Sequence, residues 1–389
     1  EDDFVNATFV QLNNVVYISN GYNEVMKYDG TQVYRAGLPA FLATHEGEAG
    51  IDFSNVTGTT PGAGVYYYKF VYSFTDAKGN TITSEPVMSQ AHTAEAGKSV
   101  KLDFDDMNYY YGDYHYDADV AFPLDHASGN IELSIYRSIK DEGTEGTFNL
   151  LTSGHNADNV DSFTDDQTDV QLENIFTALT ANVKSHDLPP KGSYITSFRG
   201  CLIVAGQKEN VNNVQFSLPK NFATGEIGSE YFPNDDNGVV VESSYGDKIS
   251  AIAPLRDALY IFHKNSIHIL TGDLTEPTGI PYMVTLLTRE GGIGCESHHS
   301  VQELQGELLF LSDKGVYGIN SSNTLREVSE RIKPLFLNTE TITLSKKRSV
   351  AFNWVEENLF VLQMAEEAED INANPAFYTS NTVTVAYDY

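Results

Sequence analysis

The chain has 389 residues, with 54 acidic against 24 basic residues and a formal net charge of −30. This charge argues against nonspecific binding to nucleic acid or anionic lipid, because phosphate contacts need clustered lysine and arginine. The length allows two or three domains with substantial cores, and the 23 tyrosines and 21 phenylalanines favour an all-β fold.

The two ends and the cysteines place few further limits on the protein. The first residues have no methionine, no basic start and no apolar run, so we expect no signal peptide, and no stretch is long enough for a membrane span. The missing methionine and the final strand-like residues indicate a piece of a longer chain. Cys201 and Cys295 imply no disulfide framework and are expected to be two buried thiols.

One pattern recurs along the chain: an apolar strand, a tight polar turn and a second apolar strand. The later turns, near Gly200, Asp257, Gly306 and Glu357, lie 57, 49 and 51 residues apart. This period is typical of β-propeller blades of four strands each. The five segments with the pattern are residues 8–18, 194–204, 252–262, 301–311 and 350–362.

A stretch with a different, strongly acidic composition separates the first of these units from the second. Residues 46–183 hold 23 acidic against 6 basic residues and so carry −17 of the −30 charges. We therefore predict an all-β chain in which a β-propeller is interrupted by an inserted β-sandwich. Residues 1–45 would form the first blade, residues 46–183 the sandwich, and residues 184–389 the remaining blades.

The predicted sandwich consists of short strands at the spacing of a domain of about 100 residues. Residues 65–74 read as a strand with one aromatic face, and Pro86 closes the next strand because proline cannot donate to a ladder. Further strands are expected at residues 99–104, 132–136, 148–152 and 162–165.

A long tyrosine-rich insertion lies within the predicted sandwich, at residues 105–128. Loops of this length in a compact domain are usually functional or mobile, and rigid aromatic rings lose little entropy on binding. A protein contact, a plain surface loop and a metal site are three open interpretations. Our candidates for a partner contact are Tyr109, Tyr110, Tyr111, Tyr114 and Tyr116.

Two short helices are also expected. Apolar residues at helical spacing predict one at residues 171–182, which leaves the sandwich. A second is predicted around Val328 to Ile332, ended by Pro334.

No set of residues predicts catalysis, a cofactor or a metal, so we expect no enzyme. His298 and His299 are adjacent, and in a strand they would point to opposite faces. The aspartates of residues 103–106 and 161–169 lack the spaced ligands of an EF-hand, and we interpret them as solvated loop carboxylates rather than a calcium site. The glycines of residues 291–294 have the wrong spacing for a dinucleotide loop and are interpreted as a turn.

Three stretches in series resemble the nozzle, or tail tubular B, proteins of short-tailed bacteriophages. They are residues 197–206 with 214–217, residues 249–262 with 266–272, and residues 308–317 with 329–332. The earlier Tyr28-Asp29-Gly30 and Gly37-Leu38-Pro39 resemble the first blade of such a propeller. Residues 64–74, 84–86, 135–138 and 163–165 resemble a fibronectin type III module.

The resemblance implies a structural virion protein located in the viral tail. Such a protein forms a ring, expected here as a hexamer, that contacts an adaptor protein and tail fibres. Viral DNA would pass through its channel without specific binding, and no membrane partner is implied. A secreted or surface adhesin that binds glycan or protein is the alternative, and a propeller hydrolase is a third class that needs convergent carboxylates.

Overall fold

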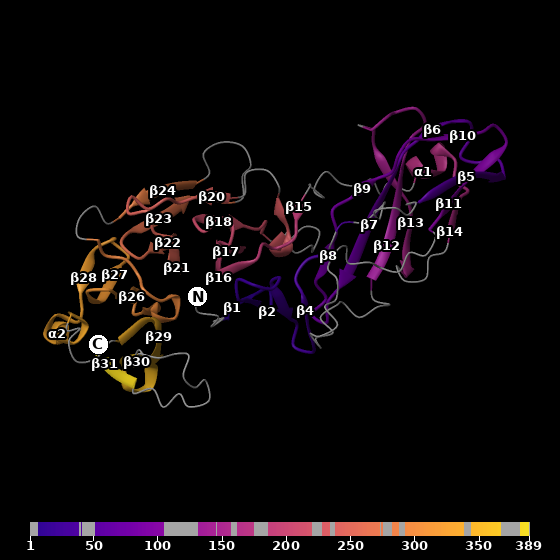
Figure 1. The fold of residues 1–389 in the computed structure, drawn as a ribbon. Helices are drawn as coiled ribbons and strands as arrows, with labels where there is room; N and C mark the ends of the chain where they lie inside the picture. The colour runs from indigo at the N-terminus through magenta and orange to yellow at the C-terminus, as the bar shows by residue number, and fades with distance from the viewer. Residues whose placement is uncertain are drawn as a thin grey trace, which may run out of the picture.

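The computed structural model describes residues 7–38, 40, 51–104, 131–144, 146–156, 162–174, 186–219, 228–233, 238–272, 274, 282–287, 292–337, 344–366 and 382–388. Over these residues the chain is nearly all β, as the composition predicts, and it is built from antiparallel sheets. None of the sheets in the described part closes into a barrel. Figure 1 shows two groups of sheets, one formed by residues 51–174 and the other by the rest of the chain.

Five sheets, here called the first to fifth sheets, follow one another in chain order. Figure 1 shows them arranged around a common centre, and the first strand of each of the first four sheets contacts the next sheet in the series. Their strands are β1 Thr8–Leu12, β2 Val15–Ser19, β3 Met26–Tyr28 and β4 Val33–Arg35; β16 Gly192–Phe198, β17 Cys201–Gln207, β18 Asn213–Phe216 and β20 Gly238–Val240; β21 Ile249–Leu255, β22 Ala258–His263, β23 Ile267–Gly272 and β24 Tyr282–Leu286; β25 Gln302–Leu304, β26 Glu307–Ser312, β27 Gly315–Asn320 and β28 Leu325–Glu327; and β29 Leu344–Trp354, β30 Leu359–Glu366 and β31 Thr382–Asp388.

Tight turns set the register of the first hairpin in these sheets. The β1–β2 loop is Asn13-Asn14, with φ of 53° and 64°, and the β16–β17 loop is Arg199-Gly200, with φ of 50° and 80°. Positive φ at both central residues matches the right-handed twist of the flanking strands, and asparagine and glycine tolerate it best. All five recurring segments therefore form hairpins, as the sequence predicts.

Apolar contacts join each sheet of this series to the next. Strand β17 illustrates the packing, because Leu202 and Val204 face the first sheet whereas Ile203 and Ala205 face the third. Sheets covered on both faces need apolar residues at successive positions, which explains the continuous burial of β17, β22 and β26. Among the described residues, no apolar cluster joins the fifth sheet to the first.

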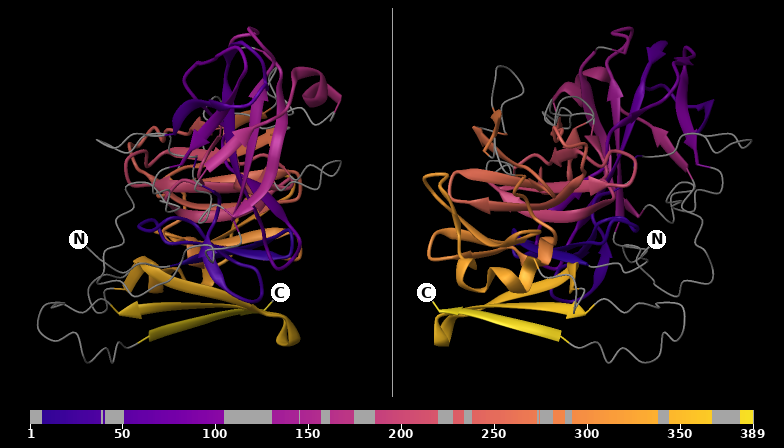
Figure 2. Two further views of the ribbon diagram at one scale, coloured as in Figure 1. Left: turned by 90° about the vertical axis from the view of Figure 1, so that its right-hand side faces the viewer. Right: turned by 60° about the vertical axis from the view of Figure 1, so that its left-hand side comes forward.

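The two terminal sheets of the series each keep one apolar face uncovered by described residues. Phe352 pairs in register with Val361, and Val361 pairs with Ala386, so these three residues share the face called here the fifth outer face, on which Val361 is 7% exposed. Val350, Phe352 and Trp354 on this face are 48%, 50% and 47% exposed. Figure 2 shows this sheet at the lower edge of the molecule, with the other described sheets on one side of it. On the first sheet, the outer face likewise exposes Phe9, Tyr28 and Val33.

The inserted region, residues 51–174, has strands where the sequence predicts them. One sheet has the order β13-β12-β7-β8 with β9 paired to β7, and smaller sheets are β14-β11-β5 and β10-β6. The predicted aromatic face is buried, with Tyr66, Tyr68, Phe70, Tyr72 and Phe74 at most 4% exposed. The elements are β5 Asp52–Thr57, β6 Gly64–Tyr66, β7 Tyr68–Thr75, β8 Thr81–Thr83, β9 Val87–Met88, β10 His92–Ala94, β11 Lys98–Asp103, β12 Ile131–Ser138, β13 Phe148–Asn156, β14 Ser162–Asp165 and α1 Asp169–Asn174.

Both helix predictions need correction in the described residues. Helix α1 begins before residue 171, and residues 175–182 lie outside the described part. The predicted helix at residues 328–332 is a 3-10 turn, η3 Glu330–Ile332, followed by α2 Lys333–Leu337. Pro334 lies inside the first turn of α2, where no intrahelical donor is lost, and does not end the helix. The remaining short elements are β15 His186–Asp187, η1 Gly228–Glu230, β19 Phe232–Pro233, η2 His298–Ser300 and η4 Val355–Glu357.

A buried ionic cluster, here called the Lys27 cluster, fastens the inserted region to the first sheet and η1. The Lys27 ammonium lies 2.5 Å from a Glu230 carboxylate oxygen and 3.5 Å from Asp76, and all three side chains are 0% exposed. Tyr17 donates to Glu230 at 3.0 Å, and the Gly37 N–H donates at 2.5 Å. The apolar core of the inserted region also includes Tyr34, Leu38 and Tyr231, which lie outside the predicted boundaries of 46–183.

Candidate functional site

A cavity of about 520 Å³ lies where the inner strands of the sheets converge, and we call it the inner pocket. Strands of four of the five sheets contribute residues to its wall, and η2, the segment before it and loops that adjoin β2, β21 and β22 supply the rest. Side chains from distant parts of the sequence therefore meet here. The lining residues are Thr8, Asn20, Tyr22, Ser193, Tyr194, Asp247, Lys248, Ser250, Lys264, Cys295, Glu296, Ser297, His298, His299 and Lys347.

Three lysines from different segments reach the inner pocket: Lys248 before β21, Lys264 after β22, and Lys347 on β29. Lys264 lies 3.2 Å from the carboxylate of Glu296, whose side chain is only 5% exposed. Lys248 and Lys347 form no ion pair with any described residue. The pocket thus concentrates cationic groups in a strongly acidic chain.

Asp247 places a carboxylate in the same wall. One of its oxygens accepts the Asn265 N–H at 2.7 Å and the Asn265 side-chain amide at 3.2 Å. Burial raises the pKa of Asp247, but hydrogen bonds from Ser243 and Asn265 outweigh it and hold the pKa below its usual value. The carboxylate is therefore ionised at neutral pH, and its other oxygen is buried with no hydrogen-bond partner among the described residues.

His298 and His299 lie in the 3-10 turn η2, so the expectation of opposite strand faces is wrong. Their ring centroids are 5.7 Å apart, and the His298 ring packs on Tyr194 at 5.0 Å. Burial, with a smaller contribution from His299, lowers the pKa of His298 to about 3. Both imidazoles have lowered pKa values and are neutral at pH 7, which suits hydrogen bonding rather than charge.

This shift predicts a pH-dependent stability. The pKa of His298 is lowered from 6.5 to about 3 on folding, so the unfolded chain binds the extra proton between these values and acid destabilises the fold. Replacing His298 with glutamine should reduce the stability lost between about pH 7 and pH 4.5 by about 2 kcal/mol, at about 1.4 kcal/mol per pKa unit. Urea unfolding at both pH values measures this difference. Equal acid sensitivity of the variant and the parent would contradict the assignment.

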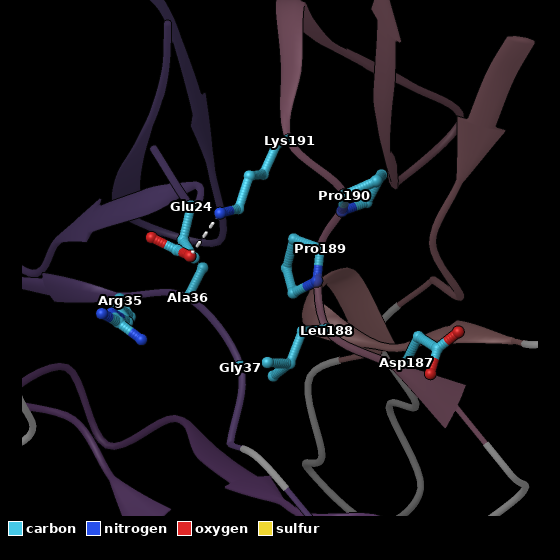
Figure 3. A pocket seen from close by; sticks show the side chains of 9 residues that line it. All are labelled: Glu24, Arg35, Ala36, Gly37, Asp187, Leu188, Pro189, Pro190 and Lys191. Atoms are coloured by element: carbon cyan, nitrogen blue, oxygen red, sulfur yellow. Dashed lines mark ion pairs between the residues drawn. The ribbon is translucent and has the colours of Figure 1, made fainter. Parts of the chain in front are cut away.

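A second cavity, of about 290 Å³, lies where the chain enters and leaves the inserted region. Figure 3 shows Lys191 reaching toward Glu24, at 2.8 Å, with Pro189 and Pro190 on the other side. Gly37 closes the approach between the two chain segments, because an added Cβ would lie 2.9 Å from Leu188. The residues that line this cavity include no nucleophile beside a general base. Glu24 and Lys191 neutralise each other in an ion pair, which is a structural role.

The tyrosines and cysteines singled out in the sequence have different outcomes in the structure. Tyr109, Tyr110, Tyr111, Tyr114 and Tyr116 lie outside the described residues, so the partner contact stays a prediction. Cys201 and Cys295 are buried thiols outside any disulfide, as expected. Burial raises the pKa of Cys295 to about 12, so this pocket residue stays a neutral thiol, which is a poor nucleophile.

One interpretation of the aspartate clusters is wrong. Asp165 is 0% exposed rather than solvated, and its carboxylate pairs with the Arg137 guanidinium at 2.6 Å. Asp169 pairs with the same guanidinium at 2.8 Å. No group of histidine, cysteine and carboxylate side chains in the described ranges is arranged to hold a metal ion.

The sequence reasoning missed Lys248, Lys347 and Asp247. A signal was available for one of them, because Lys346-Lys347-Arg348 is a basic run in an acidic chain. No signal marked the other two, since they join the pocket only through the packing of the sheets.

Comparisons with known proteins show no family for this chain. No protein-family model matches it, and no curated protein matches it. A solved structure, the extracellular domain of a putative one-component system from B. thetaiotaomicron, is 13% identical with a TM-score of 0.28. The match covers 92% of this chain and 37% of that chain, so this chain spans little more than a third of its length. Within the described residues, no helix is long and apolar enough to cross a membrane.

Proposed function

We propose that this chain is a structural subunit of a viral tail, a nozzle subunit whose copies assemble into a ring around a DNA channel. The five sheets would be blades of a β-propeller, and the inserted region would be a fibronectin type III-like sandwich projecting from the first blade. The proposal does not include catalysis.

The observation that carries the proposal is the pair of uncovered apolar faces at the ends of the sheet series. Phe352 and Trp354 on the fifth outer face, and Phe9 on the first sheet, are 50%, 47% and 63% exposed. Contiguous exposed apolar residues on a sheet mark interaction surfaces in soluble proteins. A chain with a net charge of −30 needs such faces for assembly, because its charged surfaces repel one another.

The positions of the resembling stretches agree with this role. Residues 197–206 fall on the β16–β17 hairpin, residues 249–262 on β21–β22, and residues 308–317 on β26–β27. Each stretch thus lies on a hairpin of a different sheet, as repeated blades would require. In the proposed ring the partners are neighbouring copies, an adaptor protein and tail fibres. The acidic lumen would let DNA pass without binding, since like charges repel.

The Lys27 cluster supports the same role. It makes the inserted region continuous with the first sheet, because Asp76 from the β7–β8 turn and Glu230 from η1 share one buried ammonium. A rigid projection transmits contacts with neighbours better than a flexible one would.

Assembly through the fifth outer face gives a direct test. The double variant Phe352→Ser, Trp354→Ser should weaken subunit association at least about tenfold, because burying each ring contributes more than 1 kcal/mol. The control is Val170→Ser, Met283→Ser, which alters apolar residues that are 67% and 58% exposed elsewhere. Multi-angle light scattering and negative-stain images would measure ring formation.

The outcomes separate the proposal from its alternative. Sixfold rings from the parent and the control, with monomers from the double variant, support the nozzle subunit. A parent that stays monomeric at high concentration contradicts ring assembly and favours a surface-binding protein.

A further inference from the structure

The inner pocket combines two features that together indicate the chemistry of a ligand: exposed lysines without a carboxylate partner, and buried polar atoms without a hydrogen-bond partner, both among the described residues. Lys248 and Lys347 supply cationic donors that have no carboxylate partner among the described residues. Lysine binds carboxylate and phosphate as a compact point charge. A ligand of this pocket should therefore carry a negative charge.

The same wall also holds polar atoms that need neutral hydrogen-bond partners. Oδ1 of Asp247 and Nδ1 of His298 are buried and have no hydrogen-bond partner in the described part of the chain. A buried acceptor left unpaired costs about 1–3 kcal/mol, so a partner that donates to Asp247 is favoured. A fully deprotonated anion such as sulfate has no proton to donate to a carboxylate, whereas a hydroxyl group donates to it and also pairs with a neutral imidazole.

Aromatic rings complete the lining. Tyr22 is 54% exposed at the wall, and Tyr194 lies against His298. Flat rings offer apolar area to the C–H face of a sugar while leaving the hydroxyls free for hydrogen bonds. The volume of about 520 Å³ is within the range of small-molecule pockets.

We propose that the inner pocket binds an acidic monosaccharide, whose carboxylate accepts hydrogen bonds from Lys248 and Lys347 and whose hydroxyls pair with Asp247 and His298. Two features of the ligand are required together: the negative charge and the hydroxyl groups. This inference does not rest on ring assembly, because every residue it uses belongs to one copy of the chain.

Three probes separate the chemical requirements. Isothermal titration calorimetry on the full chain would use glucuronate, glucose and inorganic sulfate. We expect glucuronate to bind with a dissociation constant on the order of 1 mM, since a small polar ligand gains little apolar burial. Glucose lacks the charge and sulfate lacks hydroxyl groups and the ring, so each should bind at least about tenfold more weakly.

A matched pair of variants tests the lysines. Lys248→Gln, Lys347→Gln should weaken glucuronate binding at least about tenfold and leave glucose binding unchanged. Lys140→Gln, Lys208→Gln removes the same charge from exposed positions outside the pocket and should bind glucuronate as the parent does. Circular dichroism would verify the fold of both variants.

Three results would overturn the proposal. The first is no glucuronate binding to the parent at about 50 mM, well above the expected constant. The second is sulfate binding as tight as glucuronate binding, which would leave the hydroxyl pairing without a role. The third is equal glucuronate affinity in the two double variants. That result would show that Lys248 and Lys347 affect binding only through the net charge of the chain.

Discussion

Replacing Glu230 with alanine is expected to lower the free energy of unfolding by about 3–5 kcal/mol. The substitution leaves Lys27, which is 0% exposed, with Asp76 at 3.5 Å as its remaining carboxylate. It also removes the acceptor of the Gly37 N–H and one of two partners of the Tyr17 hydroxyl, which keeps Ser229 at 3.2 Å. Unpaired buried donors add their own desolvation cost, so the loss should reach the upper part of this range.

The control for this experiment is Glu307→Ala. Glu307 also pairs with a basic residue, at 2.6 Å from Arg326, but the arginine side chain is 44% exposed. Solvent screening limits such pairs to about 0–1 kcal/mol. Urea unfolding of both variants gives the comparison, and equal losses would show that burial of the Lys27 cluster does not determine its contribution.

Replacing Arg137 with methionine should have a comparable effect inside the inserted region. The Arg137 guanidinium binds Asp165 at 2.6 Å, Asp169 at 2.8 Å and the carbonyl oxygen of Gln167 at 2.9 Å. Methionine fills part of the volume but leaves the Asp165 carboxylate buried without its cation. Breaking a buried pair in this way costs about 3–5 kcal/mol.

The pH dependence of this second variant distinguishes lost charge from lost packing. Burial raises the pKa of Asp165, while Arg137 opposes the shift, so removing the arginine should raise the pKa further. A carboxyl whose folded pKa is raised stabilises the fold below its unfolded pKa and loses that contribution as pH rises. The deficit of Arg137→Met should therefore be smaller at about pH 4 than at about pH 7. A deficit that stays constant over this range would indicate lost packing alone.

Local patterns predicted the hairpins because the determinants are adjacent in sequence. Asn13-Asn14 and Arg199-Gly200 adopt positive φ as two-residue loops, and the flanking strands alternate in burial or are continuously apolar. The burial of strand β7 could also be predicted from local sequence, since its aromatic residues at every second position form a buried face.

The errors concern residues whose environment comes from distant parts of the chain. The sequence made no prediction for Lys27, because its partner Glu230 is 203 positions away. Asp165 was predicted to be a solvated loop carboxylate. In the structure it is buried in an ion pair with Arg137 on β12, which the local sequence does not indicate. The inner pocket is assembled in the same way, so sequence periodicity could not place Lys248 and Lys347 in the wall of one cavity.

The contact of Gly37 with Leu188 and Pro189 has a consequence for the evolution of this architecture. The chain leaves the first sheet near Gly37 and approaches the second sheet close to the same point, since an added Cβ at Gly37 would lie 2.9 Å from Leu188 and 3.0 Å from Pro189. A lineage can therefore exchange the intervening module without altering the path of the sheets. The Lys27 cluster restricts what is exchanged, because each replacement must bring a carboxylate in the place of Asp76 and an apolar surface for Tyr34 and Tyr231.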